Sequence, residues 1–575
     1  MSKVTRELIT LQVGCYANFV GTHWWNLQEA SFVYNTSTPT DINHDFLFRE
    51  GITSQRQETY TPRLLAIDLK GSLHSLPSHG TLYSDLGEPS TSEASWGGQV
   101  ELIHQLPQEK NDFLKDLEQE DVRFRGLVDE DKDICIDDSK ISETDTASKK
   151  IYDLSKSVQV WSDFLRPHLH PNAIYLIDNL LPSVGRAAAG STGGTWGGFS
   201  SGHSAFQREE VEEEITDRIR CLAESCNSLQ GFQLLSDIHD GMGGVSCGIL
   251  QHLADEYGSK DSITFTTSPP HLAPSTDPAR ILMQASIIQS YAELSQLSSV
   301  LIPLNLRKSV LDFEAPYSAF QHLTMKEYNA YVTSSIMAAF LDTVSMAYRS
   351  RTLPLPLANV VDILTPARRK VAGGSLAFPL GISSTQSLSD WLHQEQKSSF
   401  VSLSSGCNFN LEPVSEVLTI RGIPASRLNR PDAKRSGGRV FASADQLYKD
   451  FLQTSLKPPS FRYVVGAVDP VKTPAPFPNI FTPSVTDEGY IDIYQKTPLQ
   501  GVSSVPCSAG LHQSKGLADL LQQLLTAAKK FDVMKHPSLL EEGVDKDSWV
   551  GMTEDLQDMT YNYCGDSEEI TSDDD

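Results

Sequence analysis

Two short segments of this chain carry glycines at a spacing that could hold a phosphate group. The first contains Gly14, which ends a predicted buried strand over residues 6–13 and leads into a helical pattern over residues 18–25. A glycine turn between a strand and a helix aims the backbone N–H groups of the first helical turn at one point, and such donors bind anions. The spacing predicts a phosphate-binding turn at Gly14, Cys15 and Tyr16.

The second segment contains Gly241, Gly243 and Gly244, between an apolar run over residues 232–235 and a helical pattern that reaches residue 257. The order of strand, glycines and helix predicts a second phosphate-binding turn. Glycine adopts positive φ without strain, and we expect Gly241 and Gly243 to use that freedom in a tight turn.

Two side chains in the second segment oppose phosphate binding. Met242 offers no hydroxyl, and Asp240 would bring a carboxylate close to the phosphate. Two like charges at ~4 Å repel by roughly 4 kcal/mol at an effective dielectric constant of about 20. A shifted register, with Ser246 beside the phosphate, is the alternative.

The elements that must position these turns alternate along the chain. Further strands are predicted at 63–69, 174–177 and 263–265, and helices at 208–226, 281–297 and 328–348. Alternating strands and helices are typical of a parallel sheet covered by helices on both faces. We expect a flexible loop over the glycine- and serine-rich residues 185–202 and proline-rich connections over roughly 457–478.

Composition excludes several classes of protein. The 575 residues carry a formal net charge of −26, which disfavours a general nucleic-acid binder and an anionic membrane surface as partners. The eight cysteines form no C-x-x-C pair, and no His, Cys or carboxylate group has the spacing of a metal site. No apolar run approaches the roughly 20 residues of a membrane-spanning helix, so we expect any membrane association to be peripheral.

The first 25 residues resemble the first strand and phosphate loop of tubulin, and the matching residues are Arg6, Glu7, Gln12, Gly14, Asn18, Gly21 and Trp25. Residues 217–232 resemble the segment that precedes the glycine signature of tubulin, residues 416–422 a strand of its intermediate domain, and segments between 517 and 559 its C-terminal helices. The resemblance implies an α/β fold: a tubulin-like three-layer nucleotide-binding-type domain, with a lengthened first half, an α+β intermediate domain and C-terminal helices.

The resemblance also implies a division of the chain. The implied parts of the chain are an N-terminal tubulin-like segment (1–108), an acidic and flexible insertion (109–150), the rest of the nucleotide-binding-type domain (151–380), the intermediate domain (381–510), the C-terminal helices (511–565) and an acidic tail (566–575). The long first half and the altered glycine signature are similar to those of the Misato family.

The chain departs from tubulin at the positions that contact nucleotide. Cys15 and Tyr16 replace a Gln and a small Cys, Phe19 replaces the Gln that faces the base, and Lys70 replaces a Glu that helps to hold magnesium. Mg²⁺ prefers carboxylate and phosphate oxygens, although Lys70 could instead neutralise a phosphate directly. The resemblance implies a degenerate site whose residues are Gly14, Cys15, Tyr16, Asp68, Lys70, Gly241, Gly243 and Gly244.

The acidic residues that orient water in tubulin are also replaced, by Ala347, Arg349 and Thr352. Without a carboxylate to position water, hydrolysis loses its catalyst. We therefore expect no GTPase activity and no catalytic residue, no resident cofactor or metal, and at most a residual guanine nucleotide.

The implied function is that of a non-enzymatic protein regulating mitochondrial distribution, morphology and fusion through protein contacts. The implied location is the cytoplasm and the mitochondrial outer membrane, and the implied partners are proteins at that surface. Two alternatives stay open: a GTP-binding or filament-forming tubulin-class GTPase, and a factor that assists tubulin or spindle microtubule assembly, with tubulin or a chaperonin as partner.

Overall fold

The computed structural model describes most of the chain. The described residues are 6–32, 40–52, 58–82, 109–120, 152–178, 196–272, 274, 276–351, 354–394, 400–407, 413–430, 439–455, 461–492 and 501–564. The acidic tail, Thr352, and most of the 109–150 and 185–202 segments lie outside these ranges. Within them, no helix is long and apolar enough to cross a bilayer.

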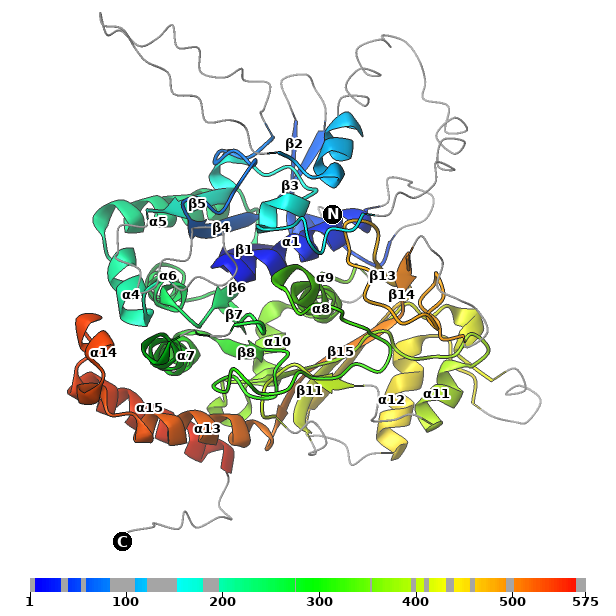
Figure 1. Ribbon diagram of the computed structural model, residues 1–575. Coiled ribbons are helices and arrows are strands. Elements are labelled where there is room, and N and C mark those ends of the chain that lie inside the picture. Colours follow the sequence, from blue (N-terminus) through cyan, green and yellow to red (C-terminus); the bar gives the residue numbers. More distant parts are fainter. Residues whose placement is uncertain are drawn as a thin grey trace, which may run out of the picture.

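A six-stranded parallel sheet forms the centre of the first half of the chain (Figure 1). Its strands lie in the order β5-β4-β1-β6-β7-β8, with bounds β1 Glu7–Val13, β4 Leu64–Leu69, β5 Ile174–Ile177, β6 Leu229–Asp237, β7 Asp261–Thr267 and β8 Val300–Leu304. The residues of β1 are all buried, including the polar Glu7, Thr10 and Gln12, because helices cover both faces of a parallel sheet.

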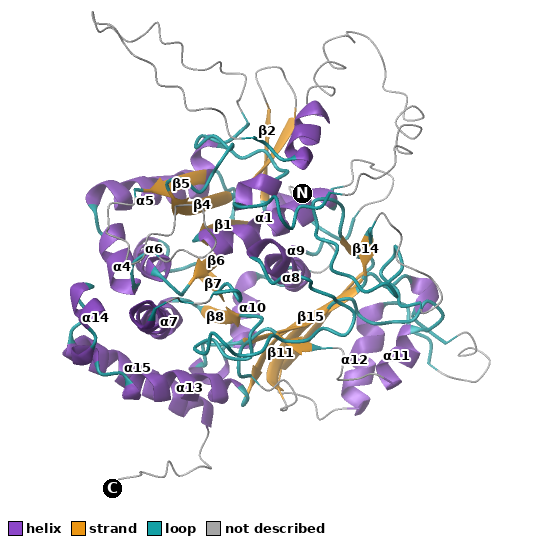
Figure 2. Cartoon of the chain, in the orientation of Figure 1, coloured by secondary structure: helices purple, strands orange, loops and turns teal. Residues whose placement is uncertain are grey.

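One face of this sheet packs on α1 (Cys15–Ala30) and α8 (Ala330–Val344), which also contact each other. The other face packs on α5 (Glu209–Glu224), α6 (Gly241–Glu256) and α7 (Asp277–Leu297). The result is the three-layer α/β domain expected from the sequence, seen from the side in Figure 2.

A short helix, α4 (Phe199–Phe206), lies against α6 on the second face of the sheet. Its first residues belong to the segment that we expected to be a flexible loop up to residue 202, and that expectation is wrong from Phe199 onward. The segment was misjudged because its small residues, Ser200, Ser201 and Gly202, indicate a loop by composition. In the folded chain Gly202 allows close contact between α4 and α6, because a Cβ atom there would lie 1.6 Å from the Gly241 carbonyl oxygen.

The carboxyl ends of β1 and β6 meet where the order of the sheet changes direction. From β1 the chain proceeds to β4 and β5 on one side, and from β6 to β7 and β8 on the other. The helices that follow these two strands, α1 and α6, lie on opposite faces. Ligands of open α/β sheets bind in this crevice, so it is the place to look for a site.

A second, five-stranded sheet lies beside the first domain, in the order β10-β9-β15-β11-β12. Its strands are β9 Gly373–Ala377, β10 Val401–Ser402, β11 Pro413–Arg421, β12 Phe461–Ala467 and β15 Cys507–Ser514, with α11 (Leu388–Gln394) and α12 (Ala444–Ser455) against it. We expected residues 457–478 to form only proline-rich connections. That expectation is wrong, because β12 lies within this range. The strands extend on both sides of the 381–510 range.

Short elements complete the fold. Two small antiparallel sheets pair β2 (Phe48–Ile52) with β3 (Glu58–Pro62) and β13 (Val471–Lys472) with β14 (Ser504–Val505). Helices α9 (Met346–Arg349) and α10 (Leu357–Leu364) follow α8, and α10 contacts strands of both sheets. The C-terminal helices α13 (Leu517–Lys530), α14 (Pro537–Glu541) and α15 (Lys546–Cys564) pack beside α7 (Figure 1).

A buried cluster of charges ties the two sheets together. The Asp342 carboxylate at the end of α8 accepts from Arg349 at 3.1 Å and from Arg421 of β11 at 2.6 Å. Gln28 of α1 also bonds to both Asp342 and Arg349. All three charged side chains are almost completely excluded from water, so this single carboxylate compensates two buried guanidinium groups.

Candidate functional site

The crevice between β1 and β6 already contains a carboxyl group of the chain itself. Asp237, the last residue of β6, accepts a hydrogen bond from the Tyr16 amide on Oδ2 at 2.8 Å and from the Ala17 amide on Oδ1 at 3.0 Å. Thr267, at the end of β7, donates its hydroxyl to Oδ1 at 2.8 Å. The first-turn donors of α1, which in a nucleotide-binding fold would bind a phosphate, are therefore taken by a carboxylate.

The arrangement replaces a local helix cap by a distant one. No side chain next to α1 caps it, and its N-cap residue is Gly14. Asp237 supplies the cap from 221 positions further along the chain. The two N–H groups and the positive end of the helix dipole both favour an anionic acceptor at this position.

Gly14 has the geometry that this contact requires. Its φ is +109°, and a Cβ atom there would lie 2.5 Å from Oδ2 of Asp237. A larger residue would therefore be strained and would displace the carboxylate. Gly14 is where the sequence predicts a phosphate turn, but its close neighbour is Asp237.

The N–H groups of the second glycine turn also donate to other groups of the chain. Asp240 caps α6 by accepting from the Met242 amide at 3.0 Å, and its backbone carbonyl accepts from Gly243. The Gly241 amide donates to the carbonyl of Trp196 at 3.0 Å. These bonds occupy the N–H groups of residues 241–243 in the first turn of α6.

The glycines of α6 serve helix packing. A Cβ at Gly244 would lie 1.9 Å from the Phe199 carbonyl of α4, and one at Gly243 would lie 2.2 Å from Ser290 Oγ of α7. None of Gly241, Gly243 and Gly244 has positive φ, so the expectation of a tight turn of that kind is wrong. Small residues are needed because α4 and α7 approach the backbone of α6 closely.

Asp68 lies at the end of β4, on the other side of the crevice, and its carboxylate accepts three hydrogen bonds. It accepts from Trp161 Nε1 at 2.9 Å, from Asn18 Nδ2 at 3.2 Å and from the Leu69 amide at 2.8 Å. Burial raises its pKa to about 6, although these donors oppose the shift. Burial also raises the pKa of Asp237 well above its usual range.

Cys15 lies at the start of α1 among these acidic groups. Burial raises the pKa of its thiol, and the carboxylates of Asp68, Asp237 and Asp240 raise it further. The thiol is therefore neutral near pH 7, and it is neither a nucleophile nor an anion-binding group. Among the described residues, no group of three or more His, Cys, Asp or Glu side chains could hold a metal ion.

Aromatic side chains fill the space between α1 and α8. The Tyr16 hydroxyl bonds to Thr333 of α8 at 3.1 Å, and burial raises the pKa of this phenol. The ring of Phe164, from the 3₁₀ turn Trp161–Phe164, lies 5.7 Å from Phe19 and 4.5 Å from His23. With Phe19 in the position that faces the base in tubulin, the same volume holds packed rings.

The side chains at the remaining sequence-predicted positions make contacts of other kinds. Lys70 is 58% exposed and pairs with Asp178 at the surface. Ser246 is buried and bonds to Ser236 of β6 at 2.7 Å. Ala347 and Arg349 lie in the buried helix α9.

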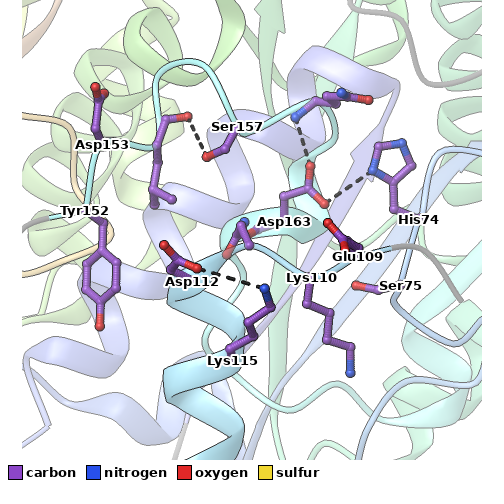
Figure 3. Close-up of a pocket in the computed structure, with 13 residues that line it drawn as sticks. His74, Ser75, Glu109, Lys110, Asp112, Lys115, Tyr152, Asp153, Ser157 and Asp163 are labelled. Carbon is purple, nitrogen blue, oxygen red and sulfur yellow. Dashed lines mark hydrogen bonds and ion pairs between the residues drawn. The ribbon is translucent and has the colours of Figure 1, made fainter.

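An open cavity lies elsewhere, near the helical residues 112–120. It has a volume of about 420 Å³, and its lining includes His74, Lys110, Tyr152 and Asp163 (Figure 3). The ring nitrogen of His74 points at Asp163 at 3.3 Å, and Lys115 points at Asp112. No residue of either glycine turn lines this cavity, so it is not a remnant of the nucleotide site.

The decisive side chain, Asp237, was missed in the sequence reasoning. The sequence predicts a strand that ends at residue 235, and it places the carboxylate of Asp240, not that of Asp237, close to the phosphate. A signal was present: an acidic residue that ends a strand parallel to the one ending at Gly14 must lie beside that glycine. Trp161 was missed too, and nothing in its local sequence indicates its contact with Asp68.

The raised pKa of Asp68 predicts a pH dependence of stability. The folded-state pKa of about 6 exceeds the ordinary value of 3.8, so protons bind more tightly to the folded chain. Its contribution to stability is complete below the unfolded pKa and is lost as the pH rises through the folded pKa.

Lowering the pH from 7 to 5 should therefore stabilise the wild type by about 1 kcal/mol more than Asp68→Asn. Urea unfolding of both proteins at the two pH values measures this difference. Equal pH dependence in the two proteins would contradict the protonation of Asp68 in this range.

The fold and the crevice define a tubulin-like protein whose phosphate-binding turns are occupied by its own groups. In agreement, residues 152–350 match the family model described as a tubulin domain, and residues 6–119 match the Misato Segment II tubulin-like domain.

The curated relatives match over nearly the whole chain. It is 31% identical to "Protein misato homolog 1" of Danio rerio over 98% of both chains. It is 30% identical to "Protein misato" of Drosophila melanogaster over 97% of this chain and 99% of the relative. "Protein DML1" of Gibberella zeae is 27% identical over 62% of this chain and 64% of the relative. The chain belongs to the Misato family, which confirms the resemblance.

Proposed function

We propose that this protein acts through protein contacts and not through nucleotide chemistry. The observation that carries the proposal is the hydrogen bonding of the Asp237 carboxylate to the first turn of α1. The Asp237 carboxylate accepts from the same N–H donors that a phosphate would engage. The chain thereby keeps the architecture of the nucleotide-bound fold without a nucleotide.

The proposal includes the absence of GTP turnover, and the position of Arg349 supports it. The resemblance to tubulin places Arg349 at a position where hydrolysis needs an acidic residue. Its side chain forms a buried ion pair with Asp342. A GTP-binding or filament-forming GTPase would require both Asp237 and the packed α4 helix to leave their places. The geometry therefore favours a non-enzymatic role over this alternative.

The cellular role that we propose is the regulation of mitochondrial distribution, morphology and fusion. It rests on membership of the Misato family and on the role that this resemblance implies. We propose a location in the cytoplasm and, peripherally, on the mitochondrial outer membrane, where the partners would be surface proteins. A factor assisting tubulin or microtubule assembly is the alternative in which the tubulin-like surface itself is recognised, with tubulin or a chaperonin as its partner.

Depletion of the chain from cells that express it separates these roles. The expected result is a collapsed or fragmented mitochondrial network with an ordinary microtubule array, and restoration of the network by re-expression of the wild-type chain. Fluorescence microscopy of mitochondria and microtubules in the same cells gives the measurement. Ordinary mitochondria with disordered spindles would overturn the mitochondrial role and favour the tubulin-assembly alternative.

A further inference from the structure

The second glycine turn is covered by a short segment of the chain, which consists of residues 196–206 and contains α4. The Gly241 amide donates to the Trp196 carbonyl at 3.0 Å. A Cβ atom at Gly241 would lie 3.0 Å from Cε3 of the Trp196 ring, so the indole lies directly beside this glycine. The Met242 and Gly243 amides donate to Asp240. The hydrogen bond of the Gly241 amide therefore depends on the covering segment, and the other two do not.

The helix in this segment is held by side chains from elsewhere in the chain. The N-cap residue of α4 contributes no side-chain hydrogen bond. Instead, the Phe199 amide donates to the Ser286 hydroxyl of α7 at 3.1 Å, and the Ser201 amide donates to Oε2 of Glu542 at 3.0 Å. The helix dipole favours a carboxylate at this end of a helix. Glu542 thus caps α4 from 341 positions further along the chain.

Glu542 belongs to the C-terminal part of the fold. It follows α14 directly, and its amide donates to the Ser538 carbonyl at 3.3 Å. Leu539 of α14 is buried in the same hydrophobic cluster as Trp196 and Phe199. The helices α4 and α14 lie on the same side of the molecule (Figure 1). The packing of α14 therefore sets the position of the carboxylate that caps α4.

The contacts of α4 are those of an element that can open locally. A helix of eight residues is not stable by itself in water, so α4 stays folded through its contacts with the rest of the chain. Phe199 and Phe206 are buried, but between them α4 meets α6 through the backbone at Gly202 and Gly244. Contacts between glycines bury little apolar surface. Elements of this kind open at a lower free energy than the central strands of a sheet.

We propose that residues 196–206 form a strap that opens and closes over the Gly241 turn as one unit, and that Glu542 holds the strap closed. The exposure of the Gly241 amide then depends on the position of the C-terminal helices. The inference rests on the proposed function in one respect: it treats this turn as a nucleotide-type site that the chain itself keeps closed.

Hydrogen exchange of the full-length chain, with fragmentation that resolves single amides in the mass spectrometer, tests the proposal. In the wild type, the amides of residues 199–206 and of Gly241 are expected to exchange at one common rate, faster than the amides of β1. Glu542→Ala should raise this common rate roughly fivefold, the size that the loss of a helix cap gives, and leave β1 unchanged. Ser286→Ala, which removes the acceptor of the Phe199 amide, should act in the same direction.

The matched control is Glu541→Ala, which removes the same type of side chain one position earlier, at an exposed site of α14. It should leave the exchange of residues 199–206 and of Gly241 unchanged. Equal exchange in the variants at 541 and 542 would overturn the role of Glu542. Faster exchange of α4 without faster exchange of Gly241, or exchange of α4 only together with β1, would overturn the strap.

The experiment contains no nucleotide, so its failure is distinct from a failure of the proposed function. A chain without a strap could still be free of guanine nucleotide. A chain that binds guanine nucleotide could still open and close at residues 196–206.

Discussion

Asp342→Asn is expected to lower the free energy of unfolding by about 3–5 kcal/mol, the largest effect of any substitution considered. The change keeps the shape of the side chain and removes its charge. Arg349 and Arg421 are almost completely shielded from water, and in the variant no carboxylate would compensate their charges. Since α8, α9 and β11 all contribute to the cluster, the loss should loosen the contact between the two sheets.

Chemical denaturation of wild type and variant gives the measurement. The matched control is Asp217→Asn, which removes the carboxylate of an exposed pair with Arg220 at 3.1 Å. Solvent screens that pair, and the control should change stability by less than about 0.5 kcal/mol. A variant at position 342 as stable as this control would show that the buried cluster does not join the two sheets.

Asp237→Ala is expected to cost about 2–4 kcal/mol, because it removes a helix cap and leaves two buried N–H groups without an acceptor. Asp237→Asn keeps one side-chain oxygen and should cost less. The Thr267 hydroxyl also loses the Asp237 carboxylate as an acceptor in the alanine variant, although the Ser236 carbonyl, at 3.2 Å, remains within its reach.

Formate provides a sharper test of the same contact. It carries the carboxylate that the alanine variant lacks, and it can bind to the amides of Tyr16 and Ala17. Added formate should raise the melting temperature of Asp237→Ala and leave that of the wild type unchanged, beyond any effect of chloride at equal ionic strength. An alanine variant as stable as the wild type, or one that formate does not stabilise, would contradict the role assigned to Asp237.

The sequence predicted the α/β class and the strands on both sides of the crevice, and its resemblance to tubulin implied the three layers. The class and the strands follow from local patterns: the strand that becomes β1, the glycine that ends it, and the spacing of Val211, Ile215 and Ile219 on α5. Each of these patterns can be recognised from residues that are close together in the sequence.

What the sequence did not predict depends on contacts between distant segments. Asp237 reaches the first turn of α1 across 221 positions, and Gly244 is small because α4 packs against it. Lys70 was placed near a phosphate, yet its side chain pairs with Asp178 on the surface. Residue types at a degenerate site show which ligand contacts are gone, but the groups that have replaced them are found only in the fold.

Native mass spectrometry of freshly purified, full-length protein tests most directly whether the crevice is filled by the chain itself. The predicted result is a mass equal to that of the polypeptide, with no guanine nucleotide retained and none acquired after incubation with GTP and magnesium. A stoichiometric mass increase equal to GDP or GTP, lost on Gly14→Ala, would contradict the account, because nucleotide and the Asp237 carboxylate cannot occupy the same N–H groups.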